Sequence, residues 1–160
     1  ALFKGQLILG AGSVLHGAGT RDMEHLGRLM KRMPLTGAGF LIGSAAICGL
    51  PPLNGFVSEF LIFLSAFLAV AAGHAAWGGT VIGSLALIGG LALACFTKAF
   101  GVVFLGEPRS KKAAEAHESG LPMVLAMAVL SLACILIGLF GPVALGWIRE
   151  ALAQACGLPP

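Results

Sequence analysis

Three ionisable side chains stand inside otherwise apolar stretches of the sequence, and these are the residues best placed to do chemistry. They are Lys4, Glu59 and Lys98, whereas the other Asp, Glu, Lys and Arg residues gather in polar stretches. A charged group near the centre of a bilayer costs on the order of 3 kcal/mol or more, so buried acids and bases usually mark an ion or proton path. These three positions are therefore the candidates for function if the chain lies in a membrane.

The composition predicts an integral membrane protein. Hydrophobic residues make up 58% of the 160 residues, charged residues make up 11%, and the mean hydropathy is +0.95. This balance is too apolar for a soluble domain of this length. The net charge of +3 is small and divided among loops, so the sequence does not indicate binding to nucleic acid. We expect the lipid bilayer to surround the chain.

A break in the helical pattern is predicted just before Glu59. Pro51 and Pro52 remove two backbone donors, and Gly55 permits backbone angles that other residues resist. Asn54 completes this predicted break. Inside a bilayer, broken backbone survives only where protein or a water-filled cavity satisfies the freed N–H and C=O groups. The sequence therefore places a carboxylate beside an irregular stretch of a membrane helix.

Two opposing effects are expected at Glu59. Free N–H groups and the helix dipole at the start of a helix favour its charged form, whereas burial favours its neutral form. Together they predict a carboxyl group poised to load and release a proton. A purely structural carboxylate would instead need a permanent cation, and Lys4 is the basic residue that this chain offers at a similar depth.

The remaining candidates have competing structural interpretations. Lys4 belongs either to a proton path or to a helix start from which it snorkels to the interface. The path is favoured because Ala1 lies inside an apolar run, which is typical of a piece of a larger membrane protein. Lys98 lies roughly 8 Å from the midpoint of its predicted helix, so a functional and an anchoring role are equally compatible. His16 is interpreted first as an interfacial histidine and only second as a proton relay.

The apolar runs predict an all-α fold, a polytopic bundle of transmembrane helices that forms a single membrane domain over 1–160. Loops are expected at 73–79 and 106–120. Five spanning segments are expected, the third of them interrupted near the break, at residues 1–17, 35–50, 53–72, 80–105 and 121–148.

An amphipathic helix is expected over Asp22–Met33. Met and Leu recur there at helical spacing, opposite acidic and basic residues, which suits a helix on the membrane surface. Thr20 or Asp22 is expected to cap its start, and Pro34 marks its end.

Two charge clusters, at 21–32 and 107–118, bear on the orientation. Three predicted spans separate them, so they are expected on opposite faces of the membrane. The first holds four Lys and Arg residues and the second holds three. The two clusters hold nearly equal numbers of basic residues, so the positive-inside rule does not orient the chain from its charge alone.

The four cysteines indicate no cofactor site. They are far apart, without CxxC or His–Cys spacing, at positions Cys48, Cys95, Cys134 and Cys156. The sequence therefore offers no framework for a disulfide, zinc or an iron–sulfur cluster. We expect neither a metal nor another cofactor in this chain, so any redox chemistry would belong to partner subunits.

Several motifs taken together resemble a known family. In chain order they are Ala1–Gly5, Gly12–His16, Asp22–Gly27, Lys31–Pro34, Gly49–Glu59 and Lys98–Phe100. The sequence resembles the C-terminal half of the proton-translocating, antiporter-like membrane subunits of complex I, Mrp antiporters and group 4 hydrogenases. The LPPLNGF-x-SE form and the KAFGVVFLG ending are most similar to the hydrogenase-4 and formate hydrogenlyase branch. The resemblance covers nearly the whole sequence.

The resemblance implies a bundle of about fourteen helices built from two inverted repeats, of which this sequence would supply the last five. In that family a central line of buried Lys, His and Glu residues conducts protons. The resemblance assigns Glu59, on a broken helix, and Lys4 to that line, and it assigns Lys98 more weakly. It also implies that residues 107–118 face the cytoplasm.

These observations favour a proton-conducting membrane-arm subunit of a hydrogenase- or NADH-dehydrogenase-type redox complex. Its expected partners are other membrane-arm subunits and a peripheral redox module, in the inner membrane of a bacterial or archaeal cell. The alternatives are a subunit of an Mrp-type sodium/proton antiporter and a membrane scaffold without transport.

Overall fold

The computed structural model describes residues 2–146, and within them the chain is α-helical with no strand. Cys156 and the end of the expected 121–148 segment lie outside the described residues. The α-helices are α1 (Leu2–Ala18), α2 (Leu29–Arg32), α3 (Pro34–Ile47), α4 (Asn54–Ala71), α5 (Ala75–Phe104), α6 (Lys111–Ala114) and α7 (Leu121–Leu139), and a 3₁₀ turn, η1, covers Met23–His25. The expected all-α fold is confirmed.

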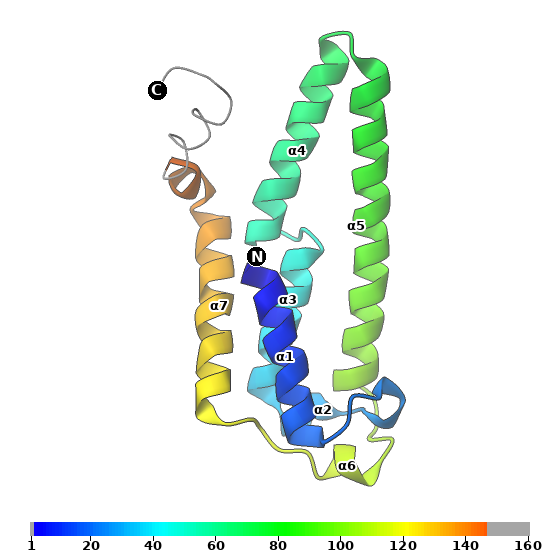
Figure 1. Cartoon of the computed structure of the whole chain (residues 1–160), viewed down its shortest axis with the longest axis vertical. Coiled ribbons are helices and arrows are strands. Elements are labelled where there is room, and N and C mark those ends of the chain that lie inside the picture. The colour runs from blue at the N-terminus through cyan, green and yellow to red at the C-terminus, as the bar shows by residue number, and fades with distance from the viewer. Residues whose placement is uncertain (1, 147–160) are drawn as a thin grey trace.

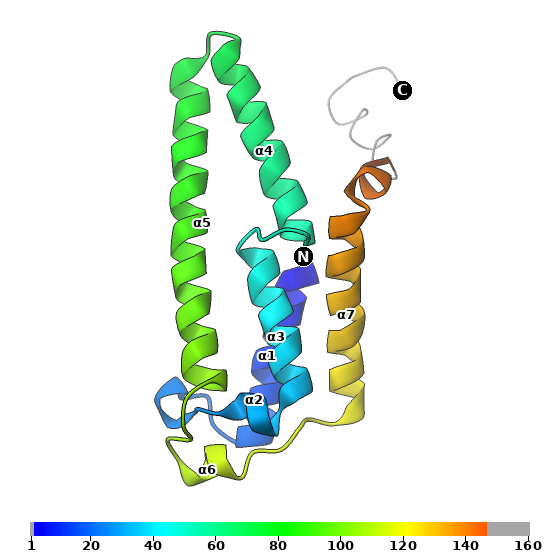
Figure 2. The ribbon, with the colours of Figure 1, turned by 180° about the vertical axis from the view of Figure 1, so that it is seen from behind.

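The helices form two regions, a three-helix bundle and a two-helix hairpin. Helices α1, α3 and α7 contact one another and stand side by side as a three-helix bundle (Figures 1 and 2). Helix α4 pairs with α5, and the two extend beyond the bundle as a hairpin. We call the end of the molecule that carries 19–33 and 105–120 the charged end.

Three helices are long and apolar enough to cross a membrane, judged by length and composition within the described residues. They are α4, α5 and α7. Helix α3 is apolar but has only 14 residues, and α1 has 17. A polytopic membrane bundle follows from these lengths, whereas the five separate spans stay a prediction.

The stretch between α3 and α4 is not helical, so no continuous helix runs from residue 47 to residue 63. Helices α3 and α4 point the same way along the molecule, and α5 returns beside both (Figures 1 and 2). At about 1.5 Å per residue, α5 is about 45 Å long. The 14 residues of α3 and the 18 of α4 together reach about 48 Å. The interpretation of α3 and α4 as one broken membrane helix stays a prediction.

The loop expected over 73–79 is wrong for most of its length. Helix α5 begins at Ala75, and only a short turn around Gly73 separates it from α4. Gly78 does not mark a turn here, because a side chain at that position would press on Ala66 and Val70 of α4. The glycine instead allows two helices to approach closely.

The single amphipathic helix expected over Asp22–Met33 is also wrong. It is replaced by η1 and α2, with Gly27 at φ 149° and Arg28 at φ 59° between them. The Arg28 N–H donates to the Leu105 carbonyl at 3.0 Å, and a side chain on Gly27 would overlap the Glu107 backbone. Contacts with a distant loop therefore override the local helical pattern.

The expected cap at Asp22 is present on η1. Its carboxylate accepts from the Glu24 N–H at 3.0 Å and lies 2.9 Å from the His25 ring. The backbone hydrogen bond to Glu24, followed by the one to His25, holds the pKa of Asp22 below its usual value. Pro34 opens α3 at its first position, where a missing N–H costs nothing.

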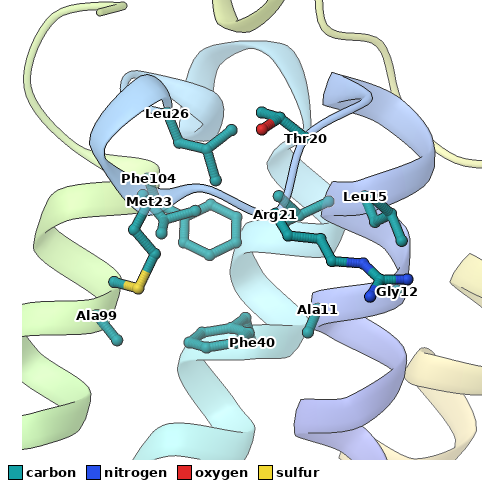
Figure 3. A pocket seen from close by; sticks show the side chains of 12 residues that line it. Ala11, Gly12, Leu15, Thr20, Arg21, Met23, Leu26, Phe40, Ala99 and Phe104 are labelled. Atoms are coloured by element: carbon teal, nitrogen blue, oxygen red, sulfur yellow. The ribbon is translucent and has the colours of Figure 1, made fainter.

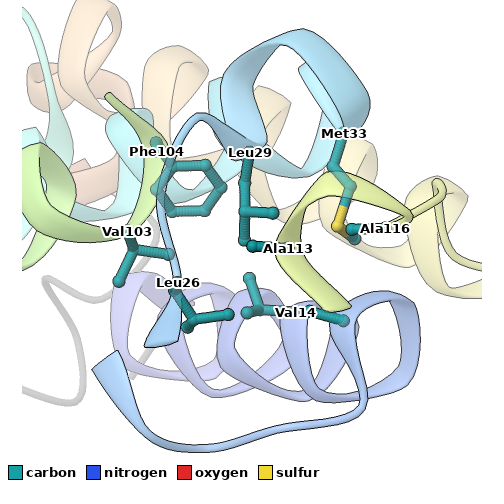
Figure 4. Packing of buried hydrophobic residues seen from close by; sticks show 9 residues of the cluster. Val14, Leu26, Leu29, Met33, Val103, Phe104, Ala113 and Ala116 are labelled. Atoms are coloured by element: carbon teal, nitrogen blue, oxygen red, sulfur yellow. The ribbon is translucent and has the colours of Figure 1, made fainter. Parts of the chain in front are cut away.

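Three apolar residues of the predicted surface helix face the protein interior at the charged end, whereas Met23 is exposed. Leu26, Leu29 and Met33 are buried in one cluster that also contains Phe104 of α5 (Figure 4). The whole cluster comprises Val14, Ala18, Leu26, Leu29, Met33, Val103, Phe104, Ala113 and Ala116. It ties α1, α2, α5 and α6 together, so the stripe is a packing surface.

The expectation that the two charge clusters lie on opposite faces is wrong. Arg28 pairs with Glu107 at 2.6 Å, and Ser110 donates to the His25 carbonyl at 2.6 Å. Both clusters therefore belong to the charged end (Figure 1). The reason is that α3 and α4 run in one direction and α5 alone returns, so the chain reverses only once between the clusters.

Candidate functional site

The turn between α3 and α4 places Glu59 against backbone. Gly49, at φ 65°, has no side chain, and a Cβ atom there would overlap the carboxylate of Glu59. Glu59 itself is half-buried on the second turn of α4. The glycine thus serves two needs: a left-handed backbone conformation and room for the carboxylate.

Small residues hold this turn in place on both sides. A side chain on Gly55, at the start of α4, would overlap the Ala46 carbonyl of α3. A side chain on Gly138 of α7 would overlap the Pro52 carbonyl. The Leu50 N–H donates to the Ala45 carbonyl at 3.0 Å. The irregular backbone expected from the prolines therefore contacts α3 and α7, while Leu50, Pro51 and Pro52 are exposed.

The other predicted path residues are exposed on the described chain. Lys4 and His16 lie on α1, and Lys98 lies on α5. No ion pair within residues 2–146 joins any of them to Glu59, since the pairs found there are Asp22–His25 and Arg28–Glu107. The structure does not bring the four predicted residues together, and their assignment to one path stays a prediction.

Uncharged polar side chains, which the sequence reasoning passed over, occupy the centre of the three-helix bundle. Gln6 of α1 is fully buried, and its amide donates to the Gly39 carbonyl at 3.0 Å and to the Ser131 hydroxyl at 2.7 Å. One side chain thus links α1, α3 and α7. Its signal in the sequence is an amide inside an apolar run, which stands out only if uncharged polar residues are considered.

A second polar cluster lies nearer the charged end. The hydroxyls of Ser13 and Thr36 are buried and 2.6 Å apart. Ser119 bonds to the Ser13 hydroxyl and donates to its carbonyl at 3.1 Å. The Glu118 carboxylate accepts from the Leu35 and Thr36 N–H groups at 3.0 and 3.3 Å, and from the Thr36 hydroxyl. These contacts satisfy the free N–H groups at the start of α3.

Three buried polar atoms have no hydrogen-bond partner within the described chain. They are Gln6 Oε1, Ser44 Oγ and Asn54 Oδ1. A buried polar atom without a hydrogen bond costs on the order of 1–3 kcal/mol, so each of the three needs a partner.

The described residues hold no cluster of His, Cys, Asp and Glu that could bind a metal. Cys48, Cys95 and Cys134 are free thiols. Carboxyl and hydroxyl groups of the kind present here can take up and release protons, and an amide can orient them by hydrogen bonds.

A hollow of about 420 Å³ opens at the charged end between α1, α3 and α5 (Figure 3). It is lined mostly by apolar side chains, with Thr20 and Arg21 at its edge. Phe40 and Phe104 form one wall, with ring centroids 5.3 Å apart. None of the four predicted path residues lines it, so the hollow and the Glu59 turn are separate features.

A family description matches this chain over more than half its length. Residues 1–85 match the family described as NADH:quinone oxidoreductase/Mrp antiporter, transmembrane. The chain belongs to this family. The resemblance inferred from the motifs is therefore confirmed at the level of the family.

Curated relatives lie on both the hydrogenase and the antiporter branches. Over 87% of the present chain, it is 49% identical to hydrogenase-4 component B of Escherichia coli. Over 99% of the present chain, it is 40% identical to formate hydrogenlyase subunit 3 of the same organism. It is 34% identical over 98% of its length to Na(+)/H(+) antiporter subunit A1 of Staphylococcus saprophyticus. It spans only 21%, 26% and 20% of these three proteins, respectively.

A solved structure shares the fold of this family member. The chain superposes on the Mrp complex from Dietzia sp. DQ12-45-1b with a TM-score of 0.73 and 21% sequence identity. The match covers 90% of this chain and 33% of that one. It supports the helical membrane architecture.

Proposed function

We propose that this chain forms part of a proton-conducting membrane-arm subunit in a hydrogenase- or NADH-dehydrogenase-type redox complex. Glu59 loads and releases the proton, Lys4 takes part in the same path, and Lys98 and His16 have weaker claims. Electron transfer takes place in partner subunits, namely a peripheral redox module bound to other membrane-arm subunits. The relatives named for hydrogenase-4 and formate hydrogenlyase support this assignment.

The observation that carries the proposal is the position of Glu59. Its carboxylate is half-buried beside a non-helical turn between two apolar helices, with Gly49 leaving space for it. It forms no ion pair with Lys, Arg or His anywhere in residues 2–146. An acid that lacks a permanent cation can change its charge without breaking a structural pair, which is what proton transfer requires.

Glu59→Gln tests the proposal in the assembled full-length complex, reconstituted in vesicles. Glutamine keeps the size of the side chain but cannot ionise, so proton translocation should fall at least tenfold while the complex still assembles. Glu59→Asp retains a titratable group and should keep part of the rate. The measurement is the initial rate of vesicle acidification per assembled complex.

Glu115→Gln is the matched control, because Glu115 is exposed at the charged end, outside the membrane-spanning helices. It should leave the translocation rate unchanged. Wild-type pumping by Glu59→Gln would remove Glu59 from the path.

The antiporter branch supplies the alternative function. The similarity to a Na(+)/H(+) antiporter subunit and the shared fold with an Mrp complex favour this second candidate. The two functions predict different driving forces for proton movement in vesicles. A redox substrate drives it in the first case, and an imposed sodium gradient drives it in the second.

The charged end supports an orientation. Both charge clusters lie there, and together they contain Arg21, Arg28, Lys31, Arg32, Arg109, Lys111 and Lys112. The turn at the far end of the hairpin, residues 72–74, contains no Lys or Arg. By the positive-inside rule the charged end faces the cytoplasm of a bacterial or archaeal cell. Cysteine labelling from either side of intact cells, at Ser110 and at Gly73, tests this directly.

A further inference from the structure

The hollow of about 420 Å³ at the charged end has walls from three helices (Figure 3). Ala11 and Gly12 of α1 line one side, and Ala99 and Val103 of α5 line the other. Phe40 of α3 lies between them, and both α1 and α5 contact α3. The volume falls within the roughly 300–1,000 Å³ that is typical of small-molecule sites. The hollow is therefore large enough to hold part of a ligand.

The segment that follows α1 bounds the hollow at the charged end. Four of its residues line the cavity: Thr20, Arg21, Met23 and Leu26. The Arg21 side chain extends towards Gly12 of α1 (Figure 3). Arg21 is exposed, and it forms no ion pair within residues 2–146. A cation without an acidic partner in the described chain thus lies at the edge of an apolar cavity.

An amphiphile with an anionic head group matches this arrangement. Apolar walls in a membrane protein accept a hydrocarbon chain, and a guanidinium group binds phosphate through paired hydrogen bonds. The charged end is also the part of the molecule that would meet the polar head groups of the bilayer. Basic pockets between membrane helices on the cytoplasmic side bind lipid head groups.

We propose that the hollow binds an anionic phospholipid of the leaflet at the charged end. Its phosphate pairs with Arg21, and the upper part of one acyl chain lies between α1 and α5 against Phe40. The inference does not rest on the proposed function, because none of the four predicted path residues lines the hollow.

A helix from the rest of the full-length protein is the competing occupant. An α-helix with its side chains is about 10–12 Å across, so it would place only a side chain or two in a cavity of this volume. It would also have to bring an acid to Arg21 or leave that charge beside apolar side chains. A phospholipid supplies the apolar chain and the negative charge in one molecule.

Photolabelling of the full-length complex tests the assignment. The complex is reconstituted in phosphatidylcholine vesicles that contain a small fraction of phosphatidylglycerol with a diazirine near the head-group end of one acyl chain. Trypsin releases residues 99–109, which include the α5 side of the hollow, and mass spectrometry measures the label on them. This peptide should carry at least fivefold more label from the phosphatidylglycerol probe than from a phosphatidylcholine probe with the same diazirine.

Arg21→Gln tests the contact with the head group. It removes the positive charge, so labelling by phosphatidylglycerol should fall at least fivefold, to the level of phosphatidylcholine. Arg32→Gln is the matched control, because Arg32 is also exposed at the charged end but does not line the hollow. It should leave the labelling by both lipids unchanged.

Gly12→Leu tests the place of the acyl chain. Nothing lies within 4 Å of a Cβ atom added at Gly12, so a leucine has room there and takes up part of the hollow. Labelling of residues 99–109 by phosphatidylglycerol should fall at least fivefold. Gly90→Leu is the control, because Gly90 of α5 has the same open space around an added Cβ but lies outside the hollow.

Three results would overturn the inference. Equal labelling by the two lipids, unchanged in Arg21→Gln, would show that the cavity does not select an anionic head group. Labelling that Gly12→Leu does not lower would come from lipid outside the hollow. Weak labelling by both lipids would mean that another part of the full-length protein fills it. If either variant prevents assembly, the ratio of the two lipids on the wild-type complex decides.

Discussion

The three-helix bundle and the hairpin are both apolar in sequence, yet they bury very different side chains. The buried polar side chains Gln6, Ser13, Thr36 and Ser131 join α1, α3 and α7 by hydrogen bonds. Within the hairpin, α4 buries only Gly55 and Ala66, and α5 buries only Gly78, Val103 and Phe104. Hydropathy alone therefore does not show which helices carry a polar interior.

The buried polar side chains of the described residues lie in the bundle and not in the hairpin. A polar side chain inside a membrane must find partners in protein or water, so the bundle is closed around its polar interior. The large apolar side chains of the hairpin, including Phe67 and Trp77, are exposed and suited to lipid or to other helices. The bundle is thus the part of this chain with a polar interior, whereas Glu59 lies at the start of the hairpin on α4.

The largest effect on stability is expected from Phe104→Ala. Phe104 is 1% exposed in the apolar cluster of the charged end, so its truncation should lower the free energy of unfolding by about 3–5 kcal/mol. Detergent-titrated unfolding of the full-length subunit measures this loss.

Phe67→Ala is the matched variant on the hairpin, because Phe67 is 65% exposed. It should change stability by less than about 1 kcal/mol where lipid or detergent covers α4. A loss as large as that of Phe104→Ala would mean that other helices of the full-length subunit pack on this face, and it would end the contrast between the two regions.

An intermediate effect is expected from Gly49→Ala. The residue is at φ 65°, so an added side chain should cost roughly 1–2 kcal/mol in backbone strain. It would also push the Glu59 carboxylate aside. The rate of proton translocation should therefore fall further than the loss of stability alone explains. The vesicle acidification rate and the unfolding midpoint of the variant are each measured relative to wild type.

Gly73→Ala isolates the strain from the contact. Gly73 is at φ 92° in the turn of the hairpin, and nothing lies within 4 Å of a side chain added there. This variant should lose similar stability but keep the wild-type rate of translocation. Equal translocation by the two variants would show that Gly49 does not position Glu59.

The smallest effect is expected from Arg28→Gln, which removes the pair with Glu107. The two side chains are 39% and 78% exposed, so the pair should contribute about 0.2–1 kcal/mol, and less at high salt. The reciprocal exchange, Arg28→Glu with Glu107→Arg, should restore what either substitution alone removes. Lack of coupling in that double-mutant cycle would argue against the contact between the two charge clusters.

Sequence patterns predicted the helical fold and the non-helical stretch before Glu59, because both follow from local chemistry. Apolar runs and the Pro51–Pro52 pair act on their own segments whatever lies nearby. The start of α5 differs from the loop expected over 73–79, because Gly78 within that range serves the contact with α4. A glycine has the same appearance in sequence for either role.

The relationships that define the candidate site join residues far apart in the chain. Gln6 bonds to Ser131, and Thr36 bonds to Glu118. No periodic pattern encodes such pairs, because each of them joins residues from separate parts of the chain. The shared location of the two charge clusters was missed for a related reason: each apolar run was counted as one crossing, although α3 is only 14 residues long.

The length of α5 sets a scale for bilayer depth. Trp77 and Lys98 are both exposed on it, 21 residues or about 32 Å apart, which matches a hydrocarbon thickness of about 30 Å. Tryptophan and lysine favour the two water–lipid boundaries, so this spacing suits Lys98 to an anchoring role. Gly78 packs between Ala66 and Val70, which fixes the antiparallel register of the hairpin. In that register Glu59 lies level with the point midway between Trp77 and Lys98, so water–lipid boundaries at these two residues would place Glu59 in the middle of the hydrocarbon layer.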